Sequence, residues 1–237
     1  MLGERKLTFK DADFWGGESI LTPHPFNMPG MEMVQIKTEE YLMPIRAKKG
    51  QRVELTKDNP QLTHVIAGLG WDINQSCYPG FDLDISVFLL GKDGKCASFK
   101  DFIFYNNLQH YSGSVEHLGD NLTGEGDGDD EQIRIDLNKI PFYVRKIVFG
   151  ATIHRGKYQD QHFGLVSNAF VRVFNECTGE ELVRYDLSKN YQHQTALVLA
   201  ELYKHGVHWK FAAIGQSSKN GLSDLVKLFG LEGRNSN

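Results

Sequence analysis

Seven acidic residues are crowded into one glycine-rich stretch, residues 116–131, which reads EHLGDNLTGEGDGDDE and contains no lysine or arginine. Repulsion among carboxylates at this density opposes folding unless a cation neutralises it. Calcium binds about six to eight oxygen atoms from carboxylates, amides and backbone carbonyls, in irregular geometry. Four glycines allow the tight bends that would aim such oxygens inward: Gly119, Gly124, Gly126 and Gly128. The stretch favours Ca²⁺ over Mg²⁺, which demands a small octahedral shell.

The spacing of this stretch excludes an EF-hand loop. Counting from Asp127 places Gln132 where that loop needs glycine and Asn138 where it needs a bidentate glutamate. Acidic, glycine-rich runs are also typical of solvated surfaces. A calcium site therefore needs further ligands from elsewhere in the chain.

A second group of carboxylates lies upstream, in the segments GLGWD and FDLDISVFLL. Asp72 ends the first segment, and Asp82 and Asp84 lie in the second. Apolar residues alternate with these two aspartates, so on a strand both side chains project from the face opposite the core. Together with Asp72 they would supply part of a coordination shell.

The elements that must position these residues are mainly strands. Alternation of apolar and polar residues over 81–89, and again over 133–137, is typical of strands with one buried face. Further β-branched and aromatic segments predict strands at 53–55, 64–67, 99–105, 144–153, 165–175, 182–186 and 209–214. Two short helices, over 194–204 and 222–229, are predicted to pack on the sheets. We expect a mainly β protein, an antiparallel β-sandwich with two short helices in its C-terminal half.

The N-terminal part of the chain differs from the rest in composition and in hydrophobic pattern. The segment 16–44 holds four of the seven prolines and four of the five methionines, without a sustained period. We therefore expect an irregular arm over residues 1–45 and a single domain over residues 46–237.

Charge and composition limit the kinds of binding partner and the cellular compartment that we expect. Twenty-six basic against 30 acidic residues give a net charge of -4, which argues against nucleic acid or an anionic membrane as the main partner. The first residues contain no apolar run that predicts a signal peptide or a membrane-inserted helix. We expect a cytoplasmic protein whose three cysteines are reduced.

Several of these segments resemble the TerD family of tellurium-resistance and stress proteins. The resemblance covers about residues 46–237 and rests on GLGWD, FDLDISVFLL, GDNLTGEGDGDDEQIRIDLNKIP, FGLVSNAFVRVFNE and WKFAAIGQ. It implies a cytoplasmic, calcium-binding β-sandwich with about two neighbouring Ca²⁺ ions at one end. Typical members begin near the strand that here contains Val53, so the resemblance implies nothing for the N-terminal arm.

The resemblance also indicates which residues would hold calcium. Side-chain oxygens would come from Asp72, Asp82, Asp84, Asp120, Asn121, Glu125, Asp127, Asp129, Asp130 and Glu131, and backbone carbonyls from Leu69, Leu122 and Gly126. Glu116 precedes the family motif, and Asp136 is expected in solvent on the polar face of its strand, so neither is included. The division of the ligands between the ions is not predicted.

The expected function is that of a calcium-binding, non-catalytic stress-response protein in resistance to tellurite and other toxic oxyanions. It would act as a calcium-responsive scaffold for other stress and tellurium-resistance proteins, in an oligomeric state that is not predicted. The alternatives are a metal-dependent enzyme or a small-ligand, nucleotide-like binding module at the same acidic site. The sequence contains no nucleophile elbow and no phosphate-binding loop motif.

Overall fold

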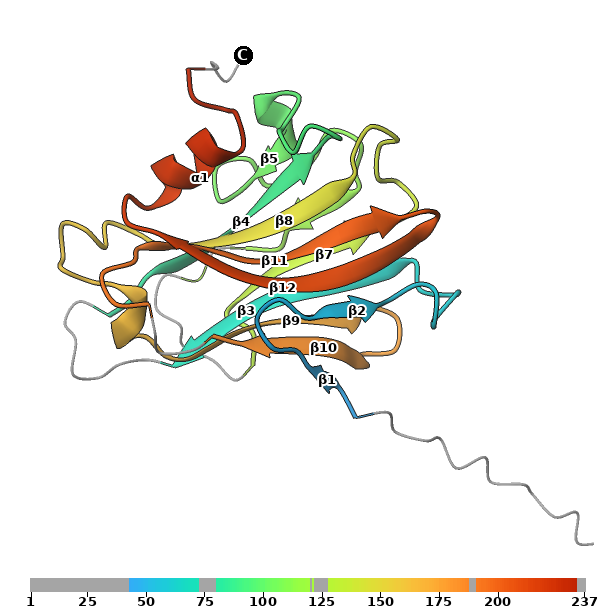
Figure 1. Ribbon diagram of the computed structural model, residues 1–237, viewed down its shortest axis with the longest axis horizontal. Helices are drawn as coiled ribbons and strands as arrows, with labels where there is room; N and C mark the ends of the chain where they lie inside the picture. Colours follow the sequence, from blue (N-terminus) through green and yellow to red (C-terminus); the bar gives the residue numbers. More distant parts are fainter. Residues whose placement is uncertain (1–42, 73–79, 120, 122–127, 188–190, 234–237) are drawn as a thin grey trace, which may run out of the picture. The chain divides into compact units, whose positions relative to one another are not determined.

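The computed structural model describes residues 43–72, 80–119, 121, 128–187 and 191–233 (Figure 1). Its strands are β1 (Ile45–Arg46), β2 (Arg52–Glu54), β3 (His64–Asp72), β4 (Leu83–Leu90), β5 (Phe102–Ile103), β6 (Val115–His117), β7 (Glu131–Asp136), β8 (Lys146–Ile153), β9 (Ser167–Asn175), β10 (Glu181–Asp186), β11 (Ala196–His205) and β12 (His208–Ser218). Its helices are the 3₁₀ turns η1 (Phe99–Asp101) and η2 (Phe163–Leu165) and the α-helix α1 (Leu222–Leu228). The predicted arm over residues 1–45 lies almost wholly outside the described residues, so the boundary at residue 46 stays a prediction.

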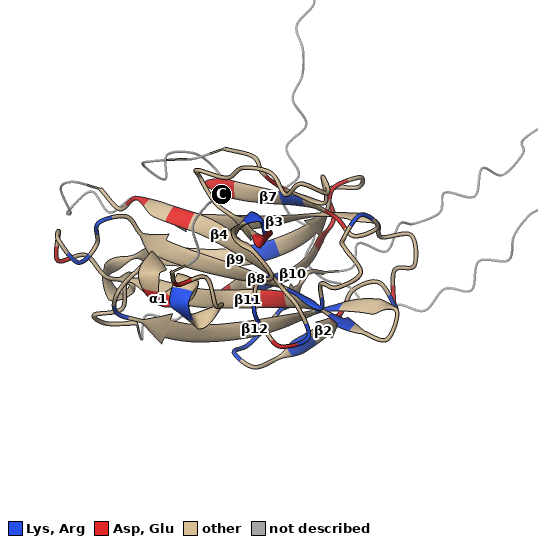
Figure 2. Ribbon diagram, turned by 90° about the horizontal axis from the view of Figure 1, so that it is seen from above, with Lys and Arg blue, Asp and Glu red and all other residues tan. Residues whose placement is uncertain are grey.

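The strands form two six-stranded sheets packed face to face, which confirms the predicted β-sandwich. One sheet, in the order β1-β10-β9-β3-β7-β6, is here called sheet A; the other, in the order β2-β12-β11-β8-β4-β5, is sheet B. Neighbouring strands are antiparallel except for β1 and β10. Basic and acidic residues are interspersed along both sheets, in keeping with the nearly balanced charge of the chain (Figure 2).

The core between the sheets follows the alternation seen in the sequence. Leu69 on β3, Leu83 and Ile85 on β4, and Ile133 on β7 are buried there. A second apolar cluster lies on the outer face of sheet B, where α1 packs its Leu225 against that face. The predicted helix over 222–229 is therefore confirmed as α1.

The prediction of a second helix, over 194–204, is wrong. This segment is strand β11, which pairs with β12 on one side and β8 on the other. A central strand is covered on both faces: Leu197 and Leu199 lie in the core between the sheets, and Ala196 and Val198 lie in the cluster under α1. Burial on both faces removes the alternation that marks a half-buried strand, leaving a continuous apolar run that resembles a buried helix.

The remaining strand predictions are confirmed in position, with shifted ends. The clearest shift is at 99–105, where η1 occupies the first three residues and β5 only the next two. Gly206, which follows the segment 194–204, lies in the hairpin turn between β11 and β12 with φ of 64°. Glycine adopts this left-handed backbone without strain.

Candidate functional site

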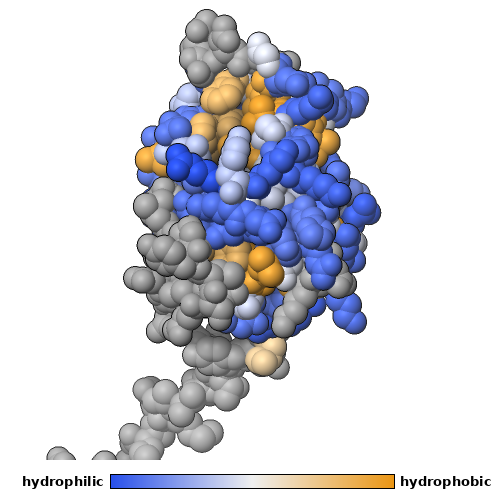
Figure 3. Space-filling model, turned by 90° about the vertical axis from the view of Figure 1, so that its left-hand side faces the viewer, coloured by the Kyte–Doolittle hydropathy of each residue, from blue (hydrophilic) through white to orange (hydrophobic). Residues whose placement is uncertain are grey.

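Most of the predicted ligands that the structure describes lie at one end of the sandwich. Strand β3 ends there at Asp72, β7 begins there at Glu131, and β4 begins there at Leu83. The pairing of Leu69 with Glu131 joins the ends of β3 and β7, and a hydrogen bond from the Ile85 N–H to the Glu131 carboxylate brings the start of β4 to them. Hydrophilic residues cover much of the described surface on this side (Figure 3).

Glu131 points inward and connects the two sheets. Its carboxylate is fully buried and accepts a hydrogen bond of 2.5 Å from the main-chain N–H of Ile85 in sheet B. The other carboxylate oxygen accepts from the N–H of Asn121 at 3.3 Å, and Nε2 of His117 lies 4.0 Å from the first oxygen. These contacts pin the end of the acidic stretch to both sheets.

Asp130 is held against the end of β3. Its carboxylate accepts a hydrogen bond of 2.8 Å from the N–H of Trp71, while its own N–H donates to the carbonyl of Leu69 at 2.8 Å. The amide of Asn121 donates to the second carboxylate oxygen at 3.4 Å. One of the predicted backbone-carbonyl ligands, Leu69, therefore already accepts the N–H of Asp130.

The charge on Asp130 is unfavourable in this setting. Burial raises the pKa of the Asp130 carboxyl, and the nearby carboxylates of Asp129 and Asp72 raise it further, against the opposing effect of the Trp71 hydrogen bond. The charges of Asp129 and Asp72 therefore add to the cost of ionising Asp130 at the end of β3.

Asp129 lies on the outer face of sheet A and is paired with a cation. Arg172 donates to its two oxygens at 2.7 and 3.1 Å, and Gln132 donates at 3.0 Å. Gly68 stands between Arg172 and Gln132 in the sheet, and a Cβ on this glycine would lie 2.1 Å from the Asp129 carboxyl carbon. Arg172 also bonds Glu181 at 3.0 Å, so one guanidinium is shared between two carboxylates.

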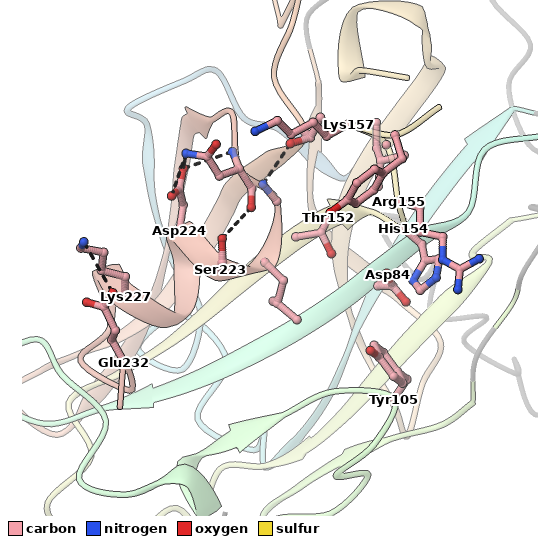
Figure 4. A pocket seen from close by; sticks show the side chains of 17 residues that line it. Asp84, Tyr105, Thr152, His154, Arg155, Lys157, Ser223, Asp224, Lys227 and Glu232 are labelled. Carbon is pink, nitrogen blue, oxygen red and sulfur yellow. Dashed lines mark hydrogen bonds and ion pairs between the residues drawn. The ribbon is translucent and has the colours of Figure 1, made fainter. Parts of the chain in front are cut away.

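The upstream aspartates occupy different positions. Asp72 is exposed, and the side-chain amide of Asn168 donates to its carboxylate at 2.5 Å. Phe81 and Leu83 lie in the core as alternation predicts, and Asp84 is buried beside Thr152 in the register of β8, lining a cavity on the outer face of sheet B (Figure 4). The carbonyl of Asp82 accepts the N–H of His154 at 2.8 Å.

The described carboxylates therefore share one end of the sandwich but face three directions. In the part of the chain that the structure describes, no three Asp, Glu, His or Cys side chains converge as a metal-binding group. Five predicted ligands lie outside the described residues: Asp120, Leu122, Glu125, Gly126 and Asp127. Their role stays a prediction.

Sequence reasoning did not find the groups that bind these carboxylates. Arg172 is far from the acidic stretch in sequence, and only the register of β9 against β3 places it opposite Gly68. One further expectation is wrong: Asp136 is buried, not solvated, beside Lys139 at 3.0 Å and His64 at 3.4 Å.

Comparison with known proteins places these features in a family. The model of the TerD domain matches residues 43–229. The chain belongs to the TerD family. It is 52% identical to general stress protein 16U of Bacillus subtilis (strain 168) over 193 residues, 80% of this chain and 99% of that protein. It is 46% identical to the tellurium resistance protein TerD of Serratia marcescens over 189 residues, 80% of this chain and 98% of that protein.

A solved TerD homologue shares the fold of this TerD-family chain. The crystal structure of a homologue of telluride resistance protein (TerD) from Streptomyces coelicolor A3(2) has a TM-score of 0.57 at 20% identity, covering 73% of this chain and 99% of that one. The chain is thus a TerD-family protein related to stress-response and tellurium-resistance proteins. Among the described residues, no helix combines the length and apolar character needed to cross a bilayer.

Proposed function

We propose that this TerD-family protein is a calcium-binding, non-catalytic stress-response protein of the cytoplasm that takes part in resistance to tellurite and other toxic oxyanions. In this proposal about two Ca²⁺ ions bind at the end of the sandwich where β3 ends and β7 begins. The ion-loaded end presents a surface to other stress and tellurium-resistance proteins.

The observation that carries this proposal is the partly buried carboxylate of Asp130, held at the end of β3 with the carboxylates of Asp129 and Asp72 nearby. Its pKa is raised by burial and by Asp129 and Asp72, a cost that a bound cation would remove. Asp130 is surrounded by carboxylates, by the side-chain amide of Asn121 and by main-chain groups of β3. Carboxylate, amide and main-chain carbonyl oxygens are the ligands that Ca²⁺ prefers. The donor chemistry therefore fits a hard divalent cation.

The described residues divide into two roles in this proposal. Asp72 and Asp130 are the described carboxylates best placed to hold an ion near β3, joined by Asp82 and Asp84 at the start of β4. Asp129 and Glu131 are already bound by Arg172 and by main-chain N–H groups, so they position the ends of the acidic stretch. Calcium would supply positive charge that lets the remaining carboxylates come together.

Calcium binding would act as an electrostatic switch. Without the ion, carboxylate repulsion opposes one fixed arrangement of residues 119–131; with it, that repulsion is offset. A ligand that binds one arrangement preferentially shifts the population toward it. A partner that recognises the loaded arrangement would then bind in a calcium-dependent way.

Asp130→Asn tests this proposal. The variant keeps an oxygen for the Trp71 N–H but removes the charge, so in chelator its melting temperature should equal or exceed that of the wild type. With excess Ca²⁺ the wild type should gain melting temperature, as expected for a ligand that binds only the folded state, and Asp130→Asn should lose most of that gain.

The matched control is Asp58→Asn, which removes an exposed carboxylate in the turn between β2 and β3. It should keep the full calcium-induced gain. An equal gain in Asp130→Asn and the wild type would remove Asp130 from the site.

A further inference from the structure

Sheet B has a second end, opposite the one at which the acidic stretch begins β7. Leu90 at the end of β4, Lys146 at the start of β8 and Tyr203 in β11 lie side by side in the register there. Beyond this row the chain runs into the turn 91–95, the loop that leads into β8, and the β11–β12 hairpin; Figure 1 shows the loop and the hairpin at the right-hand end of the sandwich. Residues 91–95, 142–145 and 204–208 are here called the basic end.

The basic end carries an excess of positive charge. It contains four cationic residues and one acidic residue, Asp93, which gives a net charge of +3 with neutral histidines; the cations are Lys92, Lys95, Arg145 and Lys204. Among the described residues, Lys92, Arg145 and Lys204 form no ion pair. The lysines on the adjoining outer face of sheet B are balanced by glutamates, in the pairs Lys146–Glu201 and Lys210–Glu54.

Two of these cations are direct neighbours. The Lys204 N–H donates to the Arg145 carbonyl at 2.9 Å, so the pairing of β11 with β8 holds the two residues together. Burial lowers the pKa of the Lys204 ammonium, and the charge of Arg145 lowers it further. An anion beside both side chains would offset this repulsion.

Apolar side chains project from the same end. Phe142 is 85% exposed in the turn 141–144, which is closed by a main-chain hydrogen bond of 3.0 Å, and Val207 is 87% exposed in the two-residue turn of the β11–β12 hairpin. Phe142 precedes Arg145 by three residues, and Val207 follows Lys204 by three. Because β8 and β11 are antiparallel neighbours, both apolar tips lie beyond the paired cations.

A further exposed ring lies beside Phe142. Tyr111 is 64% exposed, and its hydroxyl group lies 3.0 Å from that of Tyr143, whose ring centroid is 6.2 Å from that of Phe142. The Tyr143 hydroxyl also donates to the buried carboxylate of Asp101 at 2.5 Å, which fixes its position. Aromatic rings with a polar edge are typical of the boundary between water and lipid.

This combination fits an anionic lipid surface better than a nucleic acid. Bases stack on aromatic rings, but an aliphatic loop tip such as Val207 provides no stacking surface. The headgroup region of a bilayer accepts aromatic and aliphatic tips alike, and anionic lipids attract lysine and arginine side chains. The apolar tips and the adjacent cations can therefore act on the same bilayer.

We propose that the basic end binds the surface of an anionic phospholipid bilayer, with its apolar tips in the headgroup region and its unpaired cations on lipid phosphates. The net charge of the whole chain, -4, does not oppose this contact. The eight residues of β8 span about 23 Å at about 3.3 Å per residue, which exceeds two Debye lengths of about 8 Å each. The acidic stretch at the other end is therefore screened from the lipid.

Co-sedimentation of the full chain with vesicles in chelator tests the proposal. The chain should bind vesicles of equal parts phosphatidylglycerol and phosphatidylcholine, and should bind phosphatidylcholine vesicles about tenfold more weakly or less. Raising the salt concentration should weaken the binding. Lys92→Gln/Arg145→Gln should weaken it by about tenfold or more, because two of the attracted charges are removed. Phe142→Ser should weaken it by about tenfold, because an apolar ring no longer leaves water.

The matched controls lie at the other end of β8. Arg155→Gln/Lys157→Gln removes two exposed cations, and Tyr158→Ser removes a ring that is 91% exposed. Both controls should bind vesicles within about twofold of the wild type, because their positions lie beyond the screening length. Absence of binding to the anionic vesicles, equal binding to phosphatidylcholine alone, or equal weakening in a variant and its control would overturn the proposal.

Two further outcomes separate this proposal from others. Binding of a single-stranded oligonucleotide in place of the vesicles, lost in Lys92→Gln/Arg145→Gln, would assign the basic end to nucleic acid and overturn the lipid proposal. The contact goes beyond the proposed calcium function, because no residue of the basic end is a predicted calcium ligand. Vesicle binding in chelator supports it whether or not calcium binds, and a chain that binds calcium but no vesicles would contradict only the lipid proposal.

Discussion

The buried carboxylate of Glu131 in sheet A accepts a 2.5 Å hydrogen bond from the main-chain N–H of Ile85 in sheet B. This bond crosses the sandwich at the end where the predicted ligands gather. Ile85 pairs with Ala151 of β8 on one side, and the Glu131 carboxylate meets the N–H on the other. A side chain from the acidic stretch thus satisfies a buried main-chain donor of the opposite sheet.

Replacing Glu131 should lower stability strongly. Glu131→Ala removes the acceptor of the Ile85 and Asn121 N–H groups, and a buried donor left without a partner costs about 1–3 kcal/mol. We expect a loss of about 3 kcal/mol in the free energy of unfolding, measured by urea denaturation. Glu131→Gln keeps one acceptor oxygen and should lose less.

The control for this series is Glu180→Ala, in an exposed position of the turn between β9 and β10. Its free energy of unfolding should stay within about 0.5 kcal/mol of the wild type. Equal losses in Glu131→Ala and Glu180→Ala would show that the bond between the sheets contributes nothing.

Gly68→Ala should disrupt the Asp129 ion pair. The new Cβ would lie 2.1 Å from the Asp129 carboxyl carbon, so this carboxylate must move away from Arg172. Overpacking of this kind costs about 1–3 kcal/mol, again measurable by urea denaturation. Gly80→Ala is the matched control, because no atom of the described residues lies within 4 Å of its added Cβ; equal stability of the two variants would contradict the packing of Asp129 over Gly68.

Asp101 should contribute to stability in a pH-dependent way. Burial would raise the pKa of its carboxyl, but hydrogen bonds from His110 and Tyr143 and the Ser98 N–H outweigh burial, and the pKa is lowered. A carboxyl with a lowered pKa in the folded state stabilises the protein above its unfolded pKa of about 3.9, and this contribution is lost as the pH falls through the folded value.

The variant Asp101→Asn isolates this effect. At pH 7 it should unfold at a lower temperature than the wild type, and the difference should shrink as the pH falls below about 4. Thermal unfolding followed by circular dichroism across this range measures it. A difference that stays constant with pH would mean that the charge of Asp101 adds no stability.

The sequence predicts the sandwich well where strands have one buried face. In β7 the exposed Arg134 alternates with the core residues Ile133 and Ile135, and this period is visible without a structure. In β4 the same period is visible from Leu83 to Ser86, although both faces of this strand are buried. In β11 the alternation is lost because Ala196 and Val198 are covered by α1 while Leu197 and Leu199 face the other sheet. Burial of the outer face depends on where a distant helix packs, which local sequence does not encode.

The candidate site, like the fold, can be predicted only in part from the sequence. The sequence indicates that the acidic stretch and the upstream aspartates belong to one region, and the register of Leu69 with Glu131 places the ends of those segments together. The sequence does not reveal that Asp129 pairs with Arg172 or that Glu131 accepts the N–H of Ile85. Those partners come from other strands, so only the three-dimensional register determines them.

The most direct test of the central claim is calorimetric titration of the chelator-stripped full chain with Ca²⁺ and then Mg²⁺ at physiological salt. We predict binding of about two calcium ions with micromolar or tighter affinity and weaker binding of magnesium, because irregular oxygen sites favour the larger ion. No heat with calcium, together with an unchanged melting temperature, would contradict the claim and identify the acidic stretch as a solvated surface.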